Sequence, residues 1–277
     1  MAPPLSQVFF PGAFQELFST WKHFPNAVLC AGGTGFIHEQ GKRVPVFPAN
    51  IISLDKMEEL KKIRRTERYL EIGAAVKLTQ IINLGKIVPE ALTRCIMNIA
   101  DPQLRSQATI GGNLCFPLYR LDACVPMIAL DAQYELRSAQ SSHWVPAFKF
   151  TSPENKEILT RIRVPLDIWT FTWYRKFHNF VSNAGEGAIL FIMKNEKNIL
   201  TNIRILCMGK TLLRDKNSET MLVGKRLPLS RKDADAFSGS WKTYLSGVEV
   251  AEENSLTEIT KTQIINFIKT MLRHISD

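Results

Sequence analysis

The sequence predicts an α+β fold made of two successive units, and three observations support this prediction. The chain has 277 residues, more than one compact domain usually holds. Its composition, 45% hydrophobic and 22% charged, is that of a folded globular protein. The pattern changes near residue 165. Strands, helices and glycine-rich turns alternate before this point, whereas a run of strands followed by helices comes after it.

The first elements surround a glycine-rich turn. Apolar residues recur at helical spacing over 13–23 and predict an amphipathic helix. The short apolar run 27–30 predicts a buried strand, and the turn Ala31–Gly35 follows it. A further strand is expected within 44–54, where Pro48 would either break the strand or confine it to a sheet edge.

The middle of the chain alternates between strand and helix patterns. Strands are expected over 69–76, within 123–136 after an apolar stretch around Pro126, and over 157–165, where Pro165 ends the alternation. Helices are expected from residue 77 and over 90–100. The second of these helices leads into a polar run that ends in a second glycine-rich turn, Thr109–Asn113.

The last third is typical of an antiparallel sheet followed by helices. Residues 167–180 are rich in aromatic and β-forming types, and 188–195 and 202–209 resemble two strands joined at Asn195–Asn198. Ser255 and Glu258 have the spacing of a capping box. The helix predicted after it carries an apolar stripe of Ile264, Ile268, Met271 and Ile275.

The five cysteines lack the paired spacing of zinc or cysteine-ligated iron–sulfur sites. We therefore expect free thiols and no metal on this chain. None of the five histidines has a partner that the sequence identifies, so we also expect no catalytic histidine.

The net charge of +9 comes from dispersed basic residues without interleaved aromatics, which favours an acidic partner or an anionic cofactor over nucleic acid. No apolar run reaches membrane-spanning length, and no leader pattern is visible at the N-terminus. The expected location is cytoplasmic.

The two glycine-rich turns are the candidate binding elements. Gly32-Gly33 and Gly111-Gly112 would let backbone N–H groups approach an anion without interference from a Cβ. Two such turns suit the pyrophosphate of a dinucleotide. The Rossmann and P-loop patterns are both absent. From spacing alone, both segments remain open to a plainer interpretation as tight loops.

Five segments extend the pattern around these turns: FFPGAFQELFSTWKHFPNAVLCAGGTGF, YLEIGAAVKLTQI, LRSQATIGGNLCFPLYRLDACVPMIALDA, EILTRIRVP and MLVGKRLPLS. Together they resemble the FAD-binding (medium) subunit of the molybdenum hydroxylases, the xanthine dehydrogenase and carbon monoxide dehydrogenase flavoprotein family. The resemblance covers nearly the whole chain. It implies a two-lobed FAD-binding domain of the PCMH/vanillyl-alcohol-oxidase type over 1–165, with lobes of about 1–55 and 56–165. A small antiparallel sheet packed on helices would follow over 166–277.

The resemblance also implies the site residues. The segment Leu29, Cys30, Ala31, Gly32, Gly33, Thr34 and Gly35 would wrap the FAD pyrophosphate through backbone amides. The second half of the cradle would be Thr109, Gly111, Gly112 and Asn113, and the lining Ile99, Ala100, Leu104 and Ala108. Asp122 would approach the ribityl–phosphate region or merely cap a helix. Leu159 and Lys176 would border the isoalloxazine ring. Alternatively, Leu159 would be part of the strand core, and Lys176 would only extend past the aromatic residues around it.

The implied function is electron transfer within a heteromeric molybdenum hydroxylase. FAD would exchange electrons between 2Fe-2S clusters on a small partner subunit and an external acceptor such as NAD. Molybdopterin would lie on a large partner subunit. The sequence departs from the family pattern at Gly35-Phe36, at Ser106, at 115–122 and in a shortened connection over 148–158. These departures leave open an alternative, a non-catalytic assembly subunit with the same fold and weakened or lost FAD binding.

Overall fold

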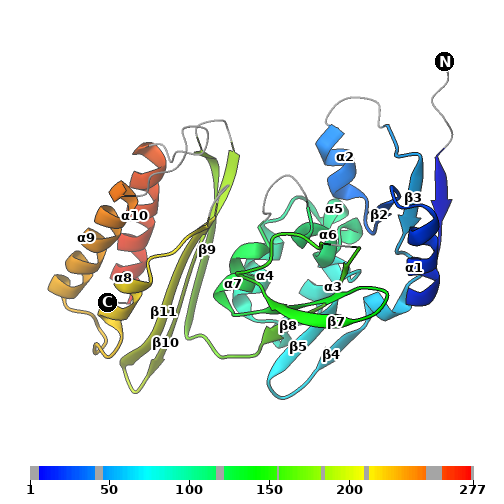
Figure 1. The fold of residues 1–277 in the computed structure, drawn as a ribbon. Coiled ribbons are helices and arrows are strands. Elements are labelled where there is room, and N and C mark those ends of the chain that lie inside the picture. Colours follow the sequence, from blue (N-terminus) through cyan, green and yellow to red (C-terminus); the bar gives the residue numbers. More distant parts are fainter. Residues whose placement is uncertain are drawn as a thin grey trace. The chain divides into compact units, whose positions relative to one another are not determined.

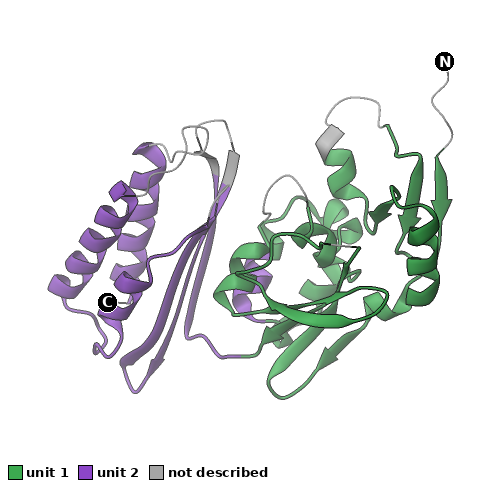
Figure 2. Cartoon of the chain, in the orientation of Figure 1, with its two compact units in different colours: residues 1–88, 96–166 green, residues 89–95, 167–277 purple. Residues whose placement is uncertain are grey.

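The computed structural model describes residues 6–40, 46–116, 122–154, 156–181, 185–208, 212–247 and 258–275. Of residues 39–40, 178–181 and 185–186 only the backbone is described. The chain divides into two compact units (Figure 2). The first comprises 1–88 and 96–166, and the second comprises 89–95 and 167–277. Each unit is taken separately below.

The first unit begins with a three-stranded parallel sheet of order β1-β3-β2 (Figure 1). Its elements are β1 (Gln7–Phe9), α1 (Phe14–His23), β2 (Val28–Cys30), α2 (Thr34–Gln40) and β3 (Asn50–Ser53). Parallel neighbours need crossover connections, which α1 and α2 provide. Pro48 was expected either to break the strand or to confine it to a sheet edge. It precedes β3, which is the central strand, so the proline ends the preceding segment and does not mark an edge strand.

A five-stranded antiparallel sheet of order β4-β5-β8-β6-β7 forms the rest of the first unit. Its strands are β4 (Ile63–Arg65), β5 (Tyr69–Gly73), β6 (Gln133–Arg137), β7 (Ser142–Pro146) and β8 (Ile158–Pro165). Short helices accompany it: η1 (Glu58–Lys61), α3 (Leu78–Asn83), η2 (Gly85–Ile87), α5 (Pro102–Gln107), α6 (Ile110–Leu114) and α7 (Cys124–Ala129). Neither α5 nor α6 was expected from the sequence, because both are short and polar or rich in glycine.

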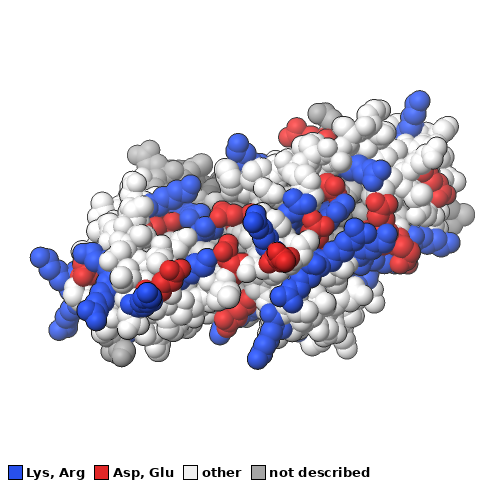
Figure 3. All heavy atoms as spheres, turned by 90° about the horizontal axis from the view of Figure 1, so that it is seen from below, with Lys and Arg blue, Asp and Glu red and all other residues white. Residues whose placement is uncertain are grey.

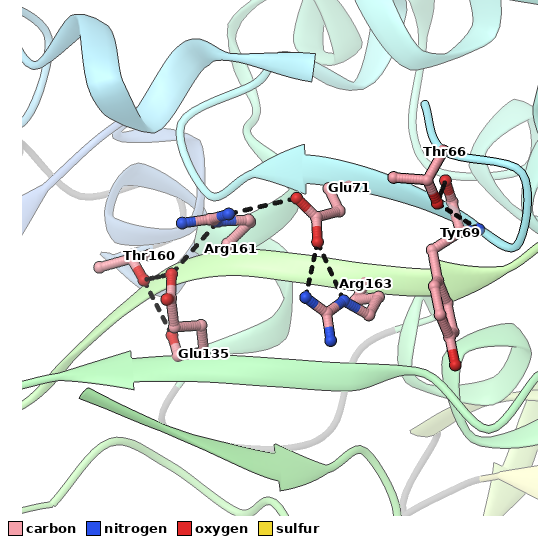
Figure 4. Close-up of polar contacts among 7 residues, drawn as sticks. All are labelled: Thr66, Tyr69, Glu71, Glu135, Thr160, Arg161 and Arg163. Atoms are coloured by element: carbon pink, nitrogen blue, oxygen red, sulfur yellow. Dashed lines mark hydrogen bonds and ion pairs between the residues drawn. The ribbon is translucent and has the colours of Figure 1, made fainter. Parts of the chain in front are cut away.

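Strand alternation separates an apolar face from a charged face in this sheet. Leu70, Ile72, Ile162 and Val164 are fully buried. The residues between them on β5 and β8 form a row of ion pairs that Figure 4 shows, with the Glu71 carboxylate held by two arginines.

Apolar packing joins the two sheets of the first unit. One buried cluster contains Leu17 of α1 and Ile52 of β3 together with Ala75, which follows β5, and Ile158 of β8. The connection over 148–158 adds a polar contact, because the Lys156 ammonium donates to the Pro25 carbonyl. That ammonium also lies 4.7 Å from the centre of the Trp21 ring.

The second unit is a four-stranded antiparallel sheet of order β12-β11-β10-β9 packed on helices (Figure 1). Its strands are β9 (Phe171–Val181), β10 (Gly185–Glu196), β11 (Ile199–Met208) and β12 (Leu212–Leu213). Its helices are α8 (Lys216–Leu222), α9 (Arg231–Gly247) and α10 (Glu258–His274), and most of α4 (Glu90–Met97) is assigned to this unit.

The core of the second unit lies between sheet and helices. It joins Phe191 and Ile205 of the strands to Trp241 of α9 and Ile268 of α10. All four residues of the predicted α10 stripe are buried. Of the predicted capping box, Ser255 lies outside the described residues, whereas Glu258 begins α10. The predicted α+β class is confirmed.

Candidate functional site

The first glycine-rich turn, which we call turn 1, comprises residues 31–35. It connects the end of β2 to the start of α2. Gly33 has a φ of 71°, a left-handed conformation that residues with a side chain rarely adopt. The first hydrogen bond of α2 runs from the Ile37 N–H to the Gly33 carbonyl at 3.2 Å. Among the described residues, no acceptor is bonded to the N–H groups of 32–35.

The four N–H groups of turn 1 are hydrogen-bond donors that an anion could accept from. Backbone donors that lack a protein acceptor and converge in a turn with one left-handed residue form a concave anion site. Thr34 adds a half-buried hydroxyl at the same place. Turn 1 therefore has donors that could bind an anion, and its binding of the FAD pyrophosphate stays a prediction.

The second glycine-rich segment differs from the expected open turn. Gly111 and Gly112 lie inside the helix α6, whose N-cap is Thr109. The Thr109 hydroxyl accepts from the Gly112 N–H at 3.1 Å. The N–H groups of Ile110, Gly111 and Asn113 donate to carbonyls at 2.8–3.0 Å. The expectation that this segment offers free amides to a phosphate is therefore wrong, because the protein itself uses them.

Gly111 is explained by packing. A Cβ at Gly111 would lie 2.6 Å from the Ala74 carbonyl oxygen and 2.7 Å from the Ala74 Cβ. The Gly111 N–H donates to that same carbonyl at 2.8 Å. The glycine thus allows α6 to pack against the end of β5. Gly112 is exposed, and a Cβ there would meet only the Thr109 hydroxyl of its own cap, at 2.9 Å.

Turn 1 and the second segment are brought together by close backbone contact. A Cβ at Gly32 would overlap the carbonyl oxygen of Gln107 and lie 3.1 Å from the Ala108 Cα. A Cβ at Gly35 would lie 2.7 Å from the Phe116 ring. Turn 1 therefore contacts the segment 107–116 at two places, before and after α6. The two elements that the sequence singled out form one site.

Arg105 fixes the approach to this site, and sequence reasoning did not assign it a role. Its Nη1 donates to the carbonyls of Met97, Ile99 and Ala100 at 3.2, 2.7 and 2.7 Å. Ala100 has a φ of 46°, so the Arg105 side chain hydrogen-bonds to a residue in the left-handed conformation just after α4. In the sequence, only the family pattern singles out Arg105, which otherwise lies in an ordinary polar stretch.

The remaining predicted lining residues differ in exposure. Ile99 is buried, Ala100 is exposed and Leu104 is 44% exposed. Leu104 belongs to α5, which Asp101 caps: its Oδ1 accepts from the Leu104 N–H at 2.8 Å. Leu104 is thus an exposed apolar side chain on the helix whose last residue, Gln107, lies against Gly32 of turn 1.

Four further predicted residues belong to other elements, and their contacts with FAD stay predictions. Asn113 is buried, and its Oδ1 accepts from the Ala123 N–H at 3.3 Å, which fixes the start of α7. Asp122 precedes that helix but is not its N-cap, which is Ala123. Leu159 is buried in β8 and Lys176 is half-buried in β9 of the second unit. The departure at 117–121 lies outside the described residues.

Two titratable groups lie where the glycine segments meet. The Lys77 Nζ donates to the Gln107 carbonyl at 3.0 Å. Burial raises the pKa of the Cys30 thiol, and the positive charge of Lys77 opposes this rise. Sequence reasoning missed Lys77, whose only local signal is a lysine at the N-cap of α3.

The described residues show no group of His, Cys, Asp or Glu that could hold a metal ion. The five cysteines are free thiols. Burial raises the pKa of Cys115 to about 12, with a further contribution from Cys124. Such a thiol stays protonated and unreactive. Within the described part of the chain, no helix is long and apolar enough to cross a membrane.

Known proteins share both the sequence pattern and the fold. Residues 5–167 match the family described as "FAD binding domain in molybdopterin dehydrogenase". The nicotinate dehydrogenase FAD-subunit of Eubacterium barkeri is 28% identical and covers 82% of this chain and 83% of its own. The carbon monoxide dehydrogenase medium chain of Hydrogenophaga pseudoflava is 26% identical, with coverages of 81% and 82%.

Solved structures share the fold over the full length. The carbon monoxide dehydrogenase structure from Hydrogenophaga pseudoflava superposes with a TM-score of 0.79 at 23% identity, covering 99% of this chain and 98% of the other. Quinoline 2-oxidoreductase from Pseudomonas putida 86 gives 0.77 at 19% identity, with coverages of 100% and 97%. The fold expected from the resemblance is thereby confirmed. The chain belongs to the family of FAD-binding domains of molybdopterin dehydrogenases, and FAD is its cofactor.

Proposed function

We propose that this chain is the electron-transfer flavoprotein subunit of a heteromeric molybdenum hydroxylase. The observation that carries the proposal is turn 1, whose four N–H groups lack acceptors among the described residues and which packs against the segment 107–116. Together with the family, this supports a site for the FAD pyrophosphate at residues 31–35.

The residues of this chain bind and orient the cofactor in this proposal. The amides of 32–35 and the Thr34 hydroxyl hold the pyrophosphate, and the exposed Leu104 with Ile99 lines its approach. Arg105 keeps that lining in place. When bound, FAD supplies a centre that takes up electrons singly and gives them up in pairs. The chain itself needs no acid, base or nucleophile for this task.

The partners follow from the same proposal. In this proposal molybdopterin lies on a large partner subunit and the 2Fe-2S clusters lie on a small one. The relatives are named as subunits or medium chains of dehydrogenases, which supports such an assembly. An external acceptor such as NAD takes the electrons from FAD, and the complex works in the cytoplasm.

The test is the flavin content of the purified chain. Acid should release FAD in a ratio near one per chain, and chromatography should separate it from FMN. A chain that holds no FAD and does not take it up when it is added would contradict the proposal.

The alternative, an assembly subunit with weakened FAD binding, has one observation in its favour. The N–H groups of Ile110, Gly111, Gly112 and Asn113 are bonded within the protein, so these four backbone donors are not available to a phosphate. Flavin stoichiometry in the intact complex separates the two functions. A full complex that oxidises its substrate without flavin on this chain would support the assembly role.

A further inference from the structure

Lys77 lies in the segment between β5 and α3, and its backbone is fixed against the second glycine segment. Lys77 and Thr109 form an antiparallel bridge. On either side, the Leu78 N–H donates to the Ala108 carbonyl at 2.9 Å, and the Ile110 N–H donates to the Val76 carbonyl at 3.0 Å. These two backbone hydrogen bonds, which form the bridge, set the position of the lysine relative to α6.

The side chain of Lys77 reaches the place where the two glycine segments touch. Its Nζ donates to the carbonyl oxygen of Gln107 at 3.0 Å. That same oxygen contacts Gly32, so closely that a Cβ on Gly32 would overlap it. The Lys77 ammonium is thus hydrogen-bonded to the same Gln107 carbonyl oxygen that packs against Gly32 of turn 1. The effect of Lys77 on the Cys30 thiol agrees with a position near the end of β2.

Lysine is a poor residue for this position on structural grounds. Position 77 is the N-cap of α3, where Ser, Thr, Asp or Asn would accept a backbone hydrogen bond. A lysine side chain has no acceptor, and its charge is unfavourable at the positive end of a helix. Among the described residues, no carboxylate forms an ion pair with Lys77. Its positive charge is therefore not compensated by the protein described.

We propose that Lys77 binds the FAD pyrophosphate together with turn 1, as the cation that neutralises it. This inference rests on the proposed function. One of the three ammonium donors is used by Gln107, which leaves two for phosphate oxygens. Turn 1 supplies neutral donors and Lys77 supplies charge, which a doubly anionic pyrophosphate needs in a half-buried site.

The test compares Lys77→Thr, Lys77→Arg and the parent chain in flavin-free form. Titration with FAD, followed by the quenching of flavin fluorescence, gives the dissociation constant at low and high salt. Loss of a charge-assisted hydrogen bond should weaken FAD binding by about tenfold to a hundredfold in Lys77→Thr. It should also flatten the salt dependence, because one charge contact is gone. Lys77→Arg should retain most of the affinity.

Thermal unfolding of the flavin-free chains separates binding from folding. Thr is a good N-cap, so Lys77→Thr should be at least as stable as the parent while binding FAD more weakly. Lys86→Met, which removes an exposed lysine of η2, is the matched control and should bind FAD as the parent does.

Equal FAD affinity and salt dependence in Lys77→Thr and the parent would overturn the inference and leave the proposed function intact. A parent chain that binds no FAD at all would overturn the proposed function itself. If Lys77→Thr fails to fold, Lys77→Arg and Lys77→Met decide by the same titration. The inference requires that Arg binds more tightly than Met.

Discussion

At the scale of single residues, the two glycines of the second segment have different reasons to be glycine. Gly111 is buried and contacts the Ala74 backbone, whereas Gly112 is exposed and contacts only Thr109 of its own cap. Adjacent glycines in a sequence look equivalent. Their roles separate only when the neighbouring strand end is in place.

Ala substitutions at the two glycines should therefore differ in stability. Gly111→Ala forces a shift of the Ala74 backbone and should lower the free energy of unfolding by about 1–3 kcal/mol. Gly112→Ala needs only a small movement of the Thr109 hydroxyl and gains helix propensity, so it should change stability by less than about 1 kcal/mol. Urea denaturation of both variants checks this. Equal losses would show that Gly111 is not the packing residue.

At the scale of elements, a row of ion pairs crosses the antiparallel sheet of the first unit (Figure 4). Arg163 donates to the Glu71 carboxylate at 2.7 and 2.9 Å, and Arg161 donates to it at 3.2 Å. Arg161 also pairs with Glu135, and the Arg163 guanidinium lies 4.1 Å from the centre of the Trp144 ring. The row joins β5, β8, β6 and β7 on the face opposite the apolar core.

The row makes stability depend on pH through Glu71. Burial alone would raise the pKa of Glu71, but hydrogen bonds from Arg163 and Arg161 outweigh it and hold the pKa below its usual range. A carboxylate with a lowered pKa in the folded state stabilises the fold above its unfolded pKa of about 4.3. This contribution is lost as the pH falls through the lowered value.

Glu71→Gln should consequently be less stable than the parent at pH 7, by about 2 kcal/mol after allowing for the partly exposed arginines. The gap should narrow as the pH falls below 4, where the parent loses the same charge. Denaturation midpoints across this range measure it. Glu67→Gln, an exposed carboxylate beside the same strand, is the control and should follow the parent. A gap that stays constant with pH would rule out Glu71 as its source.

At the scale of the whole molecule, each unit has buried apolar clusters, and the chain has an excess of basic residues. Among the described residues, one such cluster surrounds Leu17 in the first unit and another surrounds Trp241 in the second. The net charge is +9. On the face that Figure 3 shows, several lysines and arginines lie next to one another, with acidic residues beside them. Such a surface suits an acidic partner subunit as part of our proposal.

FAD should raise the thermal stability of the whole chain, because it binds the folded state and not the unfolded one. At a hundred times the dissociation constant, the gain is about 2.7 kcal/mol. ADP, which carries the pyrophosphate and adenosine, should give part of this gain, and riboflavin, which lacks the pyrophosphate, should give less. Thermal melts of the flavin-free chain measure all three. If FAD gives no shift at any concentration, the assembly role becomes the better explanation.

The sequence by itself determined much of this protein. Periodicity located α1, β5, β8 and α10, because each buries apolar residues, and the family pattern indicated turn 1 and the segment from Thr109 to Asn113. The strand β2 was also located, but its predicted burial is wrong: Val28 is 43% exposed, because β2 lies at the edge of its sheet. Tertiary structure alone decided which donors of these segments remain available. Contacts between residues far apart in the chain, such as Gly111 with Ala74 and Lys77 with Gln107, occupy some donors and leave other donors available to a ligand. A local sequence pattern cannot show which donors remain available, because it is the same whether or not an acceptor faces a given backbone N–H.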